Sequence, residues 1–474
     1  MSALEPTVIV VGNSIAAMVS AISLGEAGWR VTLVSPSKRL GGHFAGLVLG
    51  GHTFDAGMVF LEFTSYNAQP GADIASYDPS RRNDVGRFFP LVESTLRRYA
   101  EWRVVEAPLM RVQGRILPDL LIANHTASLL DLAPGTREAI AGELRALTSE
   151  GRSPLHASRK ATEPGFIDVD LHRASVANHG QTFHDLLIEP LCLKITARPT
   201  ADFLARFHRL VWIPIFYPET LVAELSGTPQ ELPHTVFSYP KAGTVAALVQ
   251  QMEQQLRASH GVTVVEGAVT SLRHDNGCGP FVIETAAGLE ATGDRLVWAA
   301  DQERLLSLLG EDSTQRMDRG SVVLVSALVH TDQVVRSFST LVIPEDERWP
   351  FRVTNQSVAA GEVAPKSRLS CEWNAAFVPG TPEEISLRTT EALIALGVVS
   401  RPEAVAELRV DVLKDALLLP TASNGACWAG RRTSLDAIFP TVPRLGPAAP
   451  FGATSFNDQI VQGMKVVHDL RANP

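Results

Sequence analysis

Thr7-Val-Ile-Val-Val-Gly-Asn-Ser-Ile-Ala-Ala17 is the stretch of sequence that decides the fold. Its first part, Thr7 to Val11, is an apolar, β-branched run of the kind found in parallel strands buried on both faces. Gly12 breaks this run, and apolar residues then recur at helical spacing from Ser14 to Gly28. A second strand is expected from Arg30 to Val34, so the segment predicts a βαβ unit.

The turn between the first strand and the helix, Gly12 to Ala17, is a degenerate form of the GxGxxG fingerprint of dinucleotide-binding folds. Gly12 permits the tight turn, Ser14 is small enough for a pyrophosphate to approach the backbone, and Ala17 allows close packing of helix on strand. The first amides of the helix would donate to the phosphates. We therefore assign these three residues to cofactor binding, with a ligand-free strand-turn-helix as the alternative.

The end of the second strand departs from the usual pattern. Dinucleotide sites carry an acidic residue there, which accepts hydrogen bonds from the adenosine ribose. In this chain Val34 is followed by Ser35, whose hydroxyl brings no charge. We assign Ser35 to ribose binding and expect this contact to be weak or shared with other groups.

Two glycine-rich segments follow, Arg39-Leu-Gly41-Gly42-His43 and Gly51-His-Thr-Phe-Asp-Ala-Gly57. They resemble the RxGG and FDxG motifs of a flavoprotein superfamily that includes FAD-dependent amine oxidases, protoporphyrinogen oxidases, phytoene desaturases and UDP-galactopyranose mutases. The resemblance implies an FAD cofactor. It also implies that Arg39 contacts the pyrophosphate or ribityl region, and that Gly41 and Gly42 let the backbone pass close to the cofactor.

A second block, Phe237 to Gly243, is similar to the YPxGG turn of protoporphyrinogen-oxidase-like proteins and precedes an apolar-periodic helix that Gly261 ends. A strand from Val262 to Val265 follows. The resemblance implies that the backbone at Val269 then grips the adenine.

A third block, Gly452 to Gly463, opens the last helix. It resembles the terminal segment that places a helix N-terminus against the flavin ring, and the resemblance assigns Asp458, Gln459 and Ile460 to the cofactor. A plain helix cap is the alternative for the polar side chains. Ala453 replaces an acidic residue common in the family. The three blocks occur in family order, and this collinearity is the strongest argument for the resemblance.

The predicted fold is therefore α/β, with a Rossmann-like FAD-binding domain, a mixed-sheet substrate domain and a helical subdomain. The FAD-binding domain is expected to be discontinuous, from 1–75, 233–312 and 430–474. Residues 80–232 are predicted to be mainly helical, and residues 318–420 to form the mixed α/β substrate domain.

Three functions are compatible with these motifs. The first is an FAD-dependent oxidoreductase that removes hydride from a C–N or C–C bond of a small molecule, since the cofactor supplies the chemistry. The second is a non-redox mutase that uses reduced flavin on a nucleotide sugar. The third is a scaffold protein, with or without flavin. The first requires only the motifs that are present.

No catalytic residue can be assigned, but three residues are candidates for substrate binding. Trp349 to Asn355 looks like the segment that carries a substrate-diphosphate arginine in the mutases, which points to Arg352 and Asn355. An ion pair is the alternative for Arg352. His43 follows the paired glycines and is expected to face the flavin or its phosphates. Met58 stands where the mutases have a histidine beside the flavin, and this difference argues against a mutase function.

Composition excludes several other classes. The 42 Lys and Arg against 51 Asp and Glu give a formal charge of −9 without long like-charge runs, which argues against nucleic acid as a partner. No apolar stretch is long enough for a spanning helix, and the four scattered cysteines favour the cytoplasm. No HxH or HExxH spacing appears, so no metal site is predicted; His184 is expected to be structural. The oligomeric state is left open.

Overall fold

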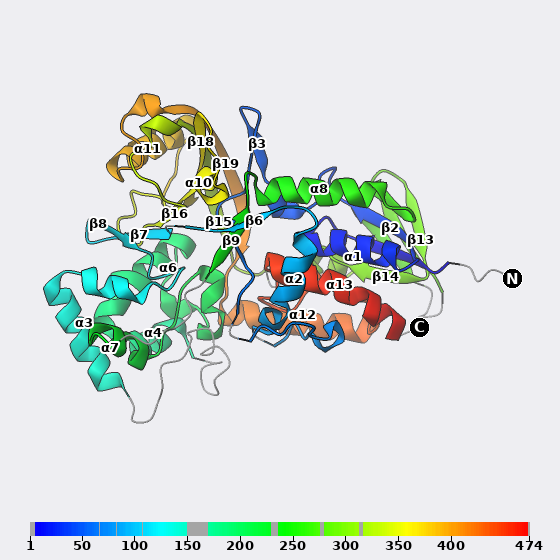
Figure 1. Cartoon of the computed structure of the whole chain (residues 1–474). Coiled ribbons are helices and arrows are strands. Elements are labelled where there is room, and N and C mark those ends of the chain that lie inside the picture. The colour runs from blue at the N-terminus through cyan, green and yellow to red at the C-terminus, as the bar shows by residue number, and fades with distance from the viewer. Residues whose placement is uncertain are drawn as a thin grey trace.

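The computed structural model describes residues 5–65, 67–81, 83–106, 108–148, 169–228, 236–274, 279–311 and 316–472. The molecule has two lobes (Figure 1). One is built around a parallel sheet and contains both ends of the described chain. The other combines a large mixed sheet with a group of helices.

The parallel sheet has the strand order β10-β2-β1-β14, and all of its pairs are parallel. Its central strand β1 is almost fully buried, as its β-branched sequence predicts. Helix α1 follows β1 directly, packs against the C-terminal helix α13 and also contacts α8. The elements are β1 (Thr7–Val11), α1 (Ile15–Glu26), β2 (Arg30–Ser35), α8 (Val245–Ala258), β10 (Val262–Glu266), β14 (Arg295–Trp298) and α13 (Phe456–Ala472).

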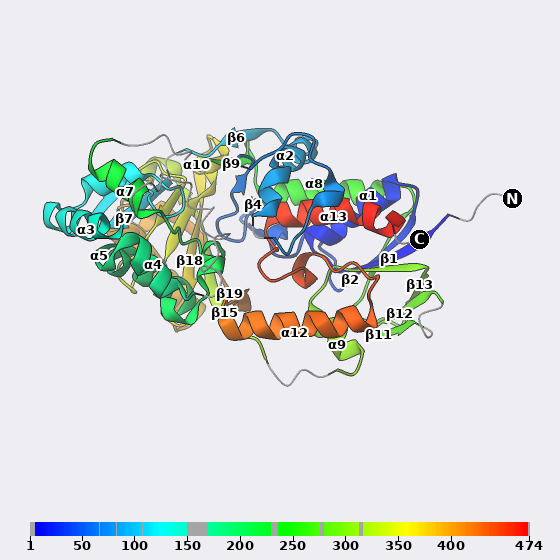
Figure 2. The ribbon, with the colours of Figure 1, turned by 90° about the horizontal axis from the view of Figure 1, so that it is seen from below.

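A three-stranded antiparallel sheet and two further helices complete this lobe. Figure 2 shows α12 running along one side of the molecule, from the large mixed sheet towards the three-stranded sheet. The elements are β11 (Val269–His274), β12 (Phe281–Thr285), β13 (Glu290–Gly293), α9 (Gln302–Leu308) and α12 (Ala422–Ile438).

The large sheet has seven strands in the order β19-β15-β18-β17-β16-β7-β8. Along β15 the side chains alternate between two cores: Val323 and Val325 share a core with α11, whereas Leu324 and Leu328 pack against the hairpin β3–β4. The elements are β3 (Leu47–Leu49), β4 (His52–Phe54), β7 (Pro108–Val112), β8 (Arg115–Pro118), β15 (Arg319–His330), β16 (Thr340–Val342), β17 (Arg352–Asn355), α10 (Gln356–Ala360), β18 (Lys366–Asn374), α11 (Pro382–Ala395) and β19 (Val405–Leu418).

The helical part of the second lobe is fastened to the large sheet by a buried lysine. The ammonium of Lys194 donates to the backbone carbonyls of Ile343, Glu345 and Pro350 at 2.7, 2.9 and 3.2 Å. These carbonyls lie between β16 and β17, so the helices and the sheet are held together. The elements are α3 (Pro134–Leu147), α4 (Leu171–His179), α5 (Gln181–Phe183), the π-helical turn η6 (His184–Ile188), α6 (Glu189–Thr196) and α7 (Pro218–Leu225).

The predicted combination of a Rossmann-like parallel sheet with a mixed sheet is confirmed. Two details differ from the expected division of the chain. Within 80–232, β7 and β8 join the large sheet, because β7 pairs in parallel with β16. Helix α12 runs across the expected boundary at residue 430. Short elements link the parts: β5 (Leu61–Glu62), α2 (Phe89–Leu96), β6 (Trp102–Val104) and β9 (Phe237–Pro240).

Candidate functional site

The turn after β1 has the close approaches that its sequence predicts. Gly12 has φ +133°, and a Cβ atom there would lie 2.4 Å from the carbonyl oxygen of Ala299, so only glycine fits. Ser14 caps α1: its hydroxyl accepts from the amide of Ala17 at 3.3 Å and donates to the carbonyl of Ala299 at 3.0 Å. The small residue at 14 is therefore also an N-cap that joins α1 to the end of β14.

The paired glycines lie directly against this turn. The amide of Gly41 donates to the carbonyl of Asn13 at 2.6 Å, and a Cβ atom on Gly42 would lie 3.9 Å from Cα of Ser14. A segment that the sequence did not single out also reaches the turn, because a Cβ atom on Gly446 would lie 2.9 Å from Oγ of Ser14. Arg39 is exposed, and its guanidinium donates to the carbonyl of Ala45. The structure thus brings distant backbone segments together around the start of α1.

His43 begins the turn after the glycines and lies in a recess. Its side chain is exposed to solvent, yet the protein around it desolvates the imidazole and lowers its pKa to about 4. Together these properties indicate a side chain in a concave place rather than on an open surface. Its ring contacts Phe44, which packs edge-on against Phe456 at the start of α13. His43 is therefore neutral at physiological pH and near the helix expected to face the cofactor.

The three residues predicted at the start of α13 have different roles. Gln459 reaches the turn after β1, where its side-chain oxygen accepts from the amide of Ala16 at 3.3 Å. Asp458 lies in the first turn of α13: its amide donates at 3.1 Å to Oγ of Ser455, which caps the helix, and its carboxylate accepts from the hydroxyl of Tyr77 at 2.9 Å. Ile460 is fully buried in the core. Among these three residues, only Gln459 contacts the turn after β1, whereas the helix cap is Ser455.

The ribose end of the expected site has an acidic residue on a neighbouring strand. Ser35 is buried, and its hydroxyl forms hydrogen bonds within the turn that follows. It donates to the carbonyl of Ser37 at 2.6 Å and accepts from the amide of Ser37 at 3.2 Å. Strand β10 lies in parallel beside β2 with Glu266 opposite Ser35. Glu266 is exposed, and its carboxylate forms no hydrogen bond or ion pair with any residue that the structure describes. A carboxylate is thus present at the carboxyl edge of the sheet, where nucleotides bind.

The backbone predicted to hold the adenine already forms hydrogen bonds with other parts of the protein. Val269 begins β11, and its carbonyl accepts a hydrogen bond from the guanidinium of Arg304. The neighbouring Ala268 carbonyl accepts from the amide of Ala286 at 2.8 Å. An adenine at this place would have to use the amide of Val269 or displace Arg304.

Asp55, from the predicted FDxG motif, joins three segments. Its carboxylate accepts from the amides of Val245 and Ala246 at 3.3 and 2.7 Å, and from the hydroxyl of Tyr239. The side chain of Gln356 bonds to both the amide and the carbonyl of Asp55 at 3.1 Å. Burial raises the pKa of Asp55 to about 6, against the effect of these donors. Asp55 thus fixes the start of α8 and the large sheet to the glycine-rich hairpin.

Arg352 is held in a buried ion pair. Its Nε and Nη2 donate to the two carboxylate oxygens of Glu372, with Nε 2.7 Å from Oε1. The same oxygen accepts from the amide of Met58 at 3.0 Å, and a Cβ atom on Gly57 would lie 2.8 Å from the carboxylate carbon. Gly57 therefore permits the FDxG turn to approach this carboxylate. The structure supports the ion-pair alternative for Arg352, because the partner occupies one edge of the guanidinium.

Asn355 begins helix α10. Its side-chain oxygen accepts from the amide of Val358 at 3.1 Å, which is the geometry of an N-cap. The residue is fully buried, so the structure shows Asn355 as the N-cap of α10 beside Gln356, and its role in substrate binding stays a prediction.

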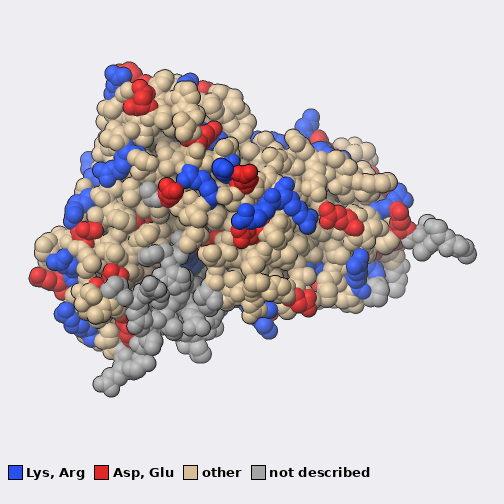
Figure 3. All heavy atoms as spheres, in the orientation of Figure 1, with Lys and Arg blue, Asp and Glu red and all other residues tan. Residues whose placement is uncertain are grey.

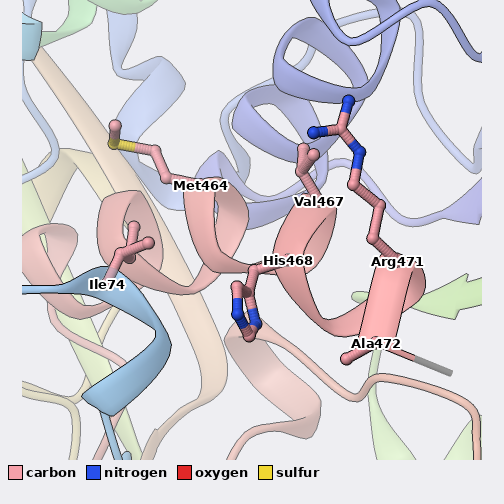
Figure 4. A pocket seen from close by; sticks show the side chains of 6 residues that line it. All are labelled: Ile74, Met464, Val467, His468, Arg471 and Ala472. Atoms are coloured by element: carbon pink, nitrogen blue, oxygen red, sulfur yellow. The ribbon is translucent and has the colours of Figure 1, made fainter.

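An open depression lies on the lobe that contains the parallel sheet, between Ile74 and the last turns of α13 (Figure 4). Its lining includes Met464, Val467 and the aliphatic part of Arg471. None of the residues predicted to bind the cofactor contributes to it. The depression is therefore separate from the candidate cofactor site.

The surface carries charges of both signs. Basic and acidic side chains are interspersed over the described part of the face in Figure 3, with no broad basic area on it. Among the residues that the structure describes, no helix is both long enough and apolar enough to cross a membrane.

The fold and the glycine-lined turn define a two-lobed α/β protein with a Rossmann-like sheet. Solved structures with a similar fold show which group of proteins within this class the chain resembles. A reduced UDP-galactopyranose mutase aligns over 100% of this chain and 95% of its own, with a TM-score of 0.75 and 14% identity. A protein from Exiguobacterium sp. 255-15, assigned as a protoporphyrinogen oxidase, aligns over 99% of both chains with a TM-score of 0.68 and 14% identity.

A putrescine oxidase bound to putrescine aligns over 99% of both chains, with a TM-score of 0.62 and 13% identity. No protein-family model matches the sequence, and no curated protein matches it. The chain therefore has the fold of the FAD-dependent amine-oxidase-like flavoproteins, as its motifs predict.

Proposed function

We propose that this protein is an FAD-dependent oxidoreductase that acts on a C–N or C–C bond of a small molecule. The observation that carries the proposal is the meeting of Gly12, Ser14, Gly42 and Gln459 at the start of α1, at the carboxyl end of a parallel sheet. Bound there, FAD would supply the redox chemistry, and the protein would supply binding and orientation.

The residues around the turn fit this cofactor. Backbone can approach a pyrophosphate closely at Gly42, whose missing side chain leaves only the Cα of Ser14 nearby. Glu266 offers a carboxylate without a described partner at the ribose end. The amides of Ala16 and Ala17 already have side-chain acceptors, so a phosphate would use earlier amides or displace Gln459.

Oxidation is favoured over the mutase reaction by the residues beside the FDxG turn. Met58, Val59 and Phe60 are buried and apolar, and they belong to the main core. The arginine expected to recognise a diphosphate, Arg352, is already paired with Glu372. An arginine neutralised by Glu372 beside an apolar core suits an uncharged or weakly polar substrate better than a nucleotide sugar.

The mutase is kept as the second candidate because of one observation. The full-length structural similarity to a reduced UDP-galactopyranose mutase has a TM-score of 0.75, above those of the two oxidases described above. A mutase of this kind would need reduced flavin and would release no oxidised product.

The deciding experiment begins with the absorbance spectrum of the purified protein. We expect flavin bands, or stoichiometric uptake of added FAD with quenching of its fluorescence. Reduction of an acceptor dye or release of peroxide on addition of amines or alkene precursors would then support the oxidoreductase. Dithionite-dependent isomerisation of a nucleotide sugar would support the mutase. A colourless protein that takes up no FAD would contradict both and support a scaffold.

Glu266→Gln is expected to weaken FAD binding about tenfold. A hydrogen bond from a ribose hydroxyl to a carboxylate is worth about 1.5 to 3 kcal/mol, and the amide retains part of it. The dissociation constant is measured by titrating FAD into apoprotein and following fluorescence. Glu391→Gln, the same change on an exposed residue of α11, should leave the constant unchanged. Equal constants for both variants would exclude Glu266 from the ribose site.

A further inference from the structure

Three side chains in the helical part of the second lobe direct ligand atoms towards one point. His172 comes from α4, His184 from the turn η6, and Glu189 from the start of α6. Nδ1 of His172 lies 3.1 Å from Nε2 of His184, which lies 3.5 Å from Oε2 of Glu189. All three atoms lie within 4.8 Å of one another.

The π-helical turn explains how two of these residues share a face. In an α-helix, residues five apart point about 140° away from each other. Here the amide of Glu189 donates to the carbonyl of His184, the i to i+5 bond of a π-turn, which widens the turn by one residue. The local distortion thus brings the carboxylate back towards the imidazole. Such turns are frequent at functional sites.

The surroundings of the three residues favour a metal ion over a simple ion pair. Thr200 holds Oε2 of Glu189 through its amide at 3.1 Å and through its hydroxyl, so the carboxylate is oriented by a second layer of contacts. His184 is buried, whereas His172 and Glu189 are partly exposed, which leaves a side open to solvent.

Two of the three separations between ligand atoms agree with tetrahedral coordination, and the third is at most 4.8 Å. Ligands about 2.0 to 2.1 Å from a zinc ion lie roughly 3.3 Å apart in a tetrahedron. The two measured separations, 3.1 and 3.5 Å, bracket this value. Two imidazoles and one carboxylate are ligands typical of zinc, with a water molecule in the fourth position.

We propose that His172, His184 and Glu189 form a binding site for a divalent transition-metal ion of the zinc type. The ion would replace the hydrogen bond between the two imidazoles and would fasten α4 to α6. The site is built on elements separate from the glycine-lined turn, so it does not depend on the proposed cofactor. It also differs from the sequence prediction, which expected no metal.

The test uses the full chain after treatment with EDTA and removal of the chelator. Titration with zinc chloride in a calorimeter should show one ion bound per chain. Cobalt(II) should give the intense visible absorption of a tetrahedral site. His172→Ala should lower the zinc affinity at least a hundredfold and abolish the cobalt spectrum, with an unchanged circular dichroism spectrum.

His260→Ala removes an exposed histidine from the other lobe and serves as the matched control. Glu189→Gln, which preserves the size of the side chain, provides a second variant and should lower the zinc affinity at least tenfold. Absence of zinc binding by the wild type, or equal affinities for His172→Ala and His260→Ala, would overturn the proposal. FAD uptake is measured separately and does not decide this test.

Discussion

Glu372→Ala should lower the free energy of unfolding by about 3 to 5 kcal/mol, because it leaves a buried guanidinium without its counter-charge. The side chains of Arg352 and Glu372 are only 7% and 9% exposed. The carboxylate also accepts from the amide of Met58, so this amide loses its partner too. Urea denaturation followed by tryptophan fluorescence measures the loss.

A double substitution distinguishes the cost of an unpaired buried charge from the cost of losing the ion pair itself. Arg352→Met combined with Glu372→Met removes both charges and fills much of the space, so it should cost far less than Glu372→Ala alone. Arg348→Ala removes the exposed partner of a surface ion pair with Asp346 and should cost far less than Glu372→Ala. A cost for Glu372→Ala as small as that of Arg348→Ala would show that the buried pair is not maintained in solution.

The same pair shows what a sequence can and cannot predict. The motif around Arg352 indicated an arginine near the site, and the structure places it beside the FDxG turn. Its partner could not be predicted, because Glu372 lies opposite it only through the antiparallel register of β17 and β18. A substrate arginine and a structural arginine look alike until that register is known.

Local features were predicted well. The strand-turn-helix at Gly12 depends on neighbouring residues, and its glycine, cap and buried strand follow from the order of side chains along a few residues. The resemblance predicted that the backbone at Gly41 and Gly42 passes close to the cofactor, and it did not predict the approach of Gly41 to the turn after β1. That approach is realised by one backbone hydrogen bond to Asn13.

Features that depend on strand order were missed. Ser35 was expected to be a weak ribose partner, but nothing near it in sequence indicated Glu266, which is adjacent only because β10 lies beside β2. The metal-ligand cluster was missed for a different reason. His184 and Glu189 have no recognised ligand spacing, and a π-turn rather than an α-helix brings them together.

Asp55→Asn should remove a pH-dependent contribution to the free energy of unfolding that amounts to about 3 kcal/mol. The pKa of Asp55 rises from an ordinary value of 3.8 to about 6 in the folded protein, chiefly through burial. Below about pH 4 the carboxyl is protonated in both states. Between about pH 4 and 6 the unfolded chain loses this proton and the folded chain keeps it, so the wild type loses stability as pH rises. Above about pH 6 the contribution is constant.

The asparagine cannot ionise, so the difference in unfolding free energy between wild type and Asp55→Asn isolates this contribution. The advantage of the wild type should shrink by about 3 kcal/mol from pH 4 to 7. Asp332→Asn, on an exposed residue, should show no such trend. A flat difference would mean that Tyr239 and the amides of Val245 and Ala246 keep Asp55 ionised throughout. The carboxylate would then act as a fixed anchor for α8, and burial would not govern its charge.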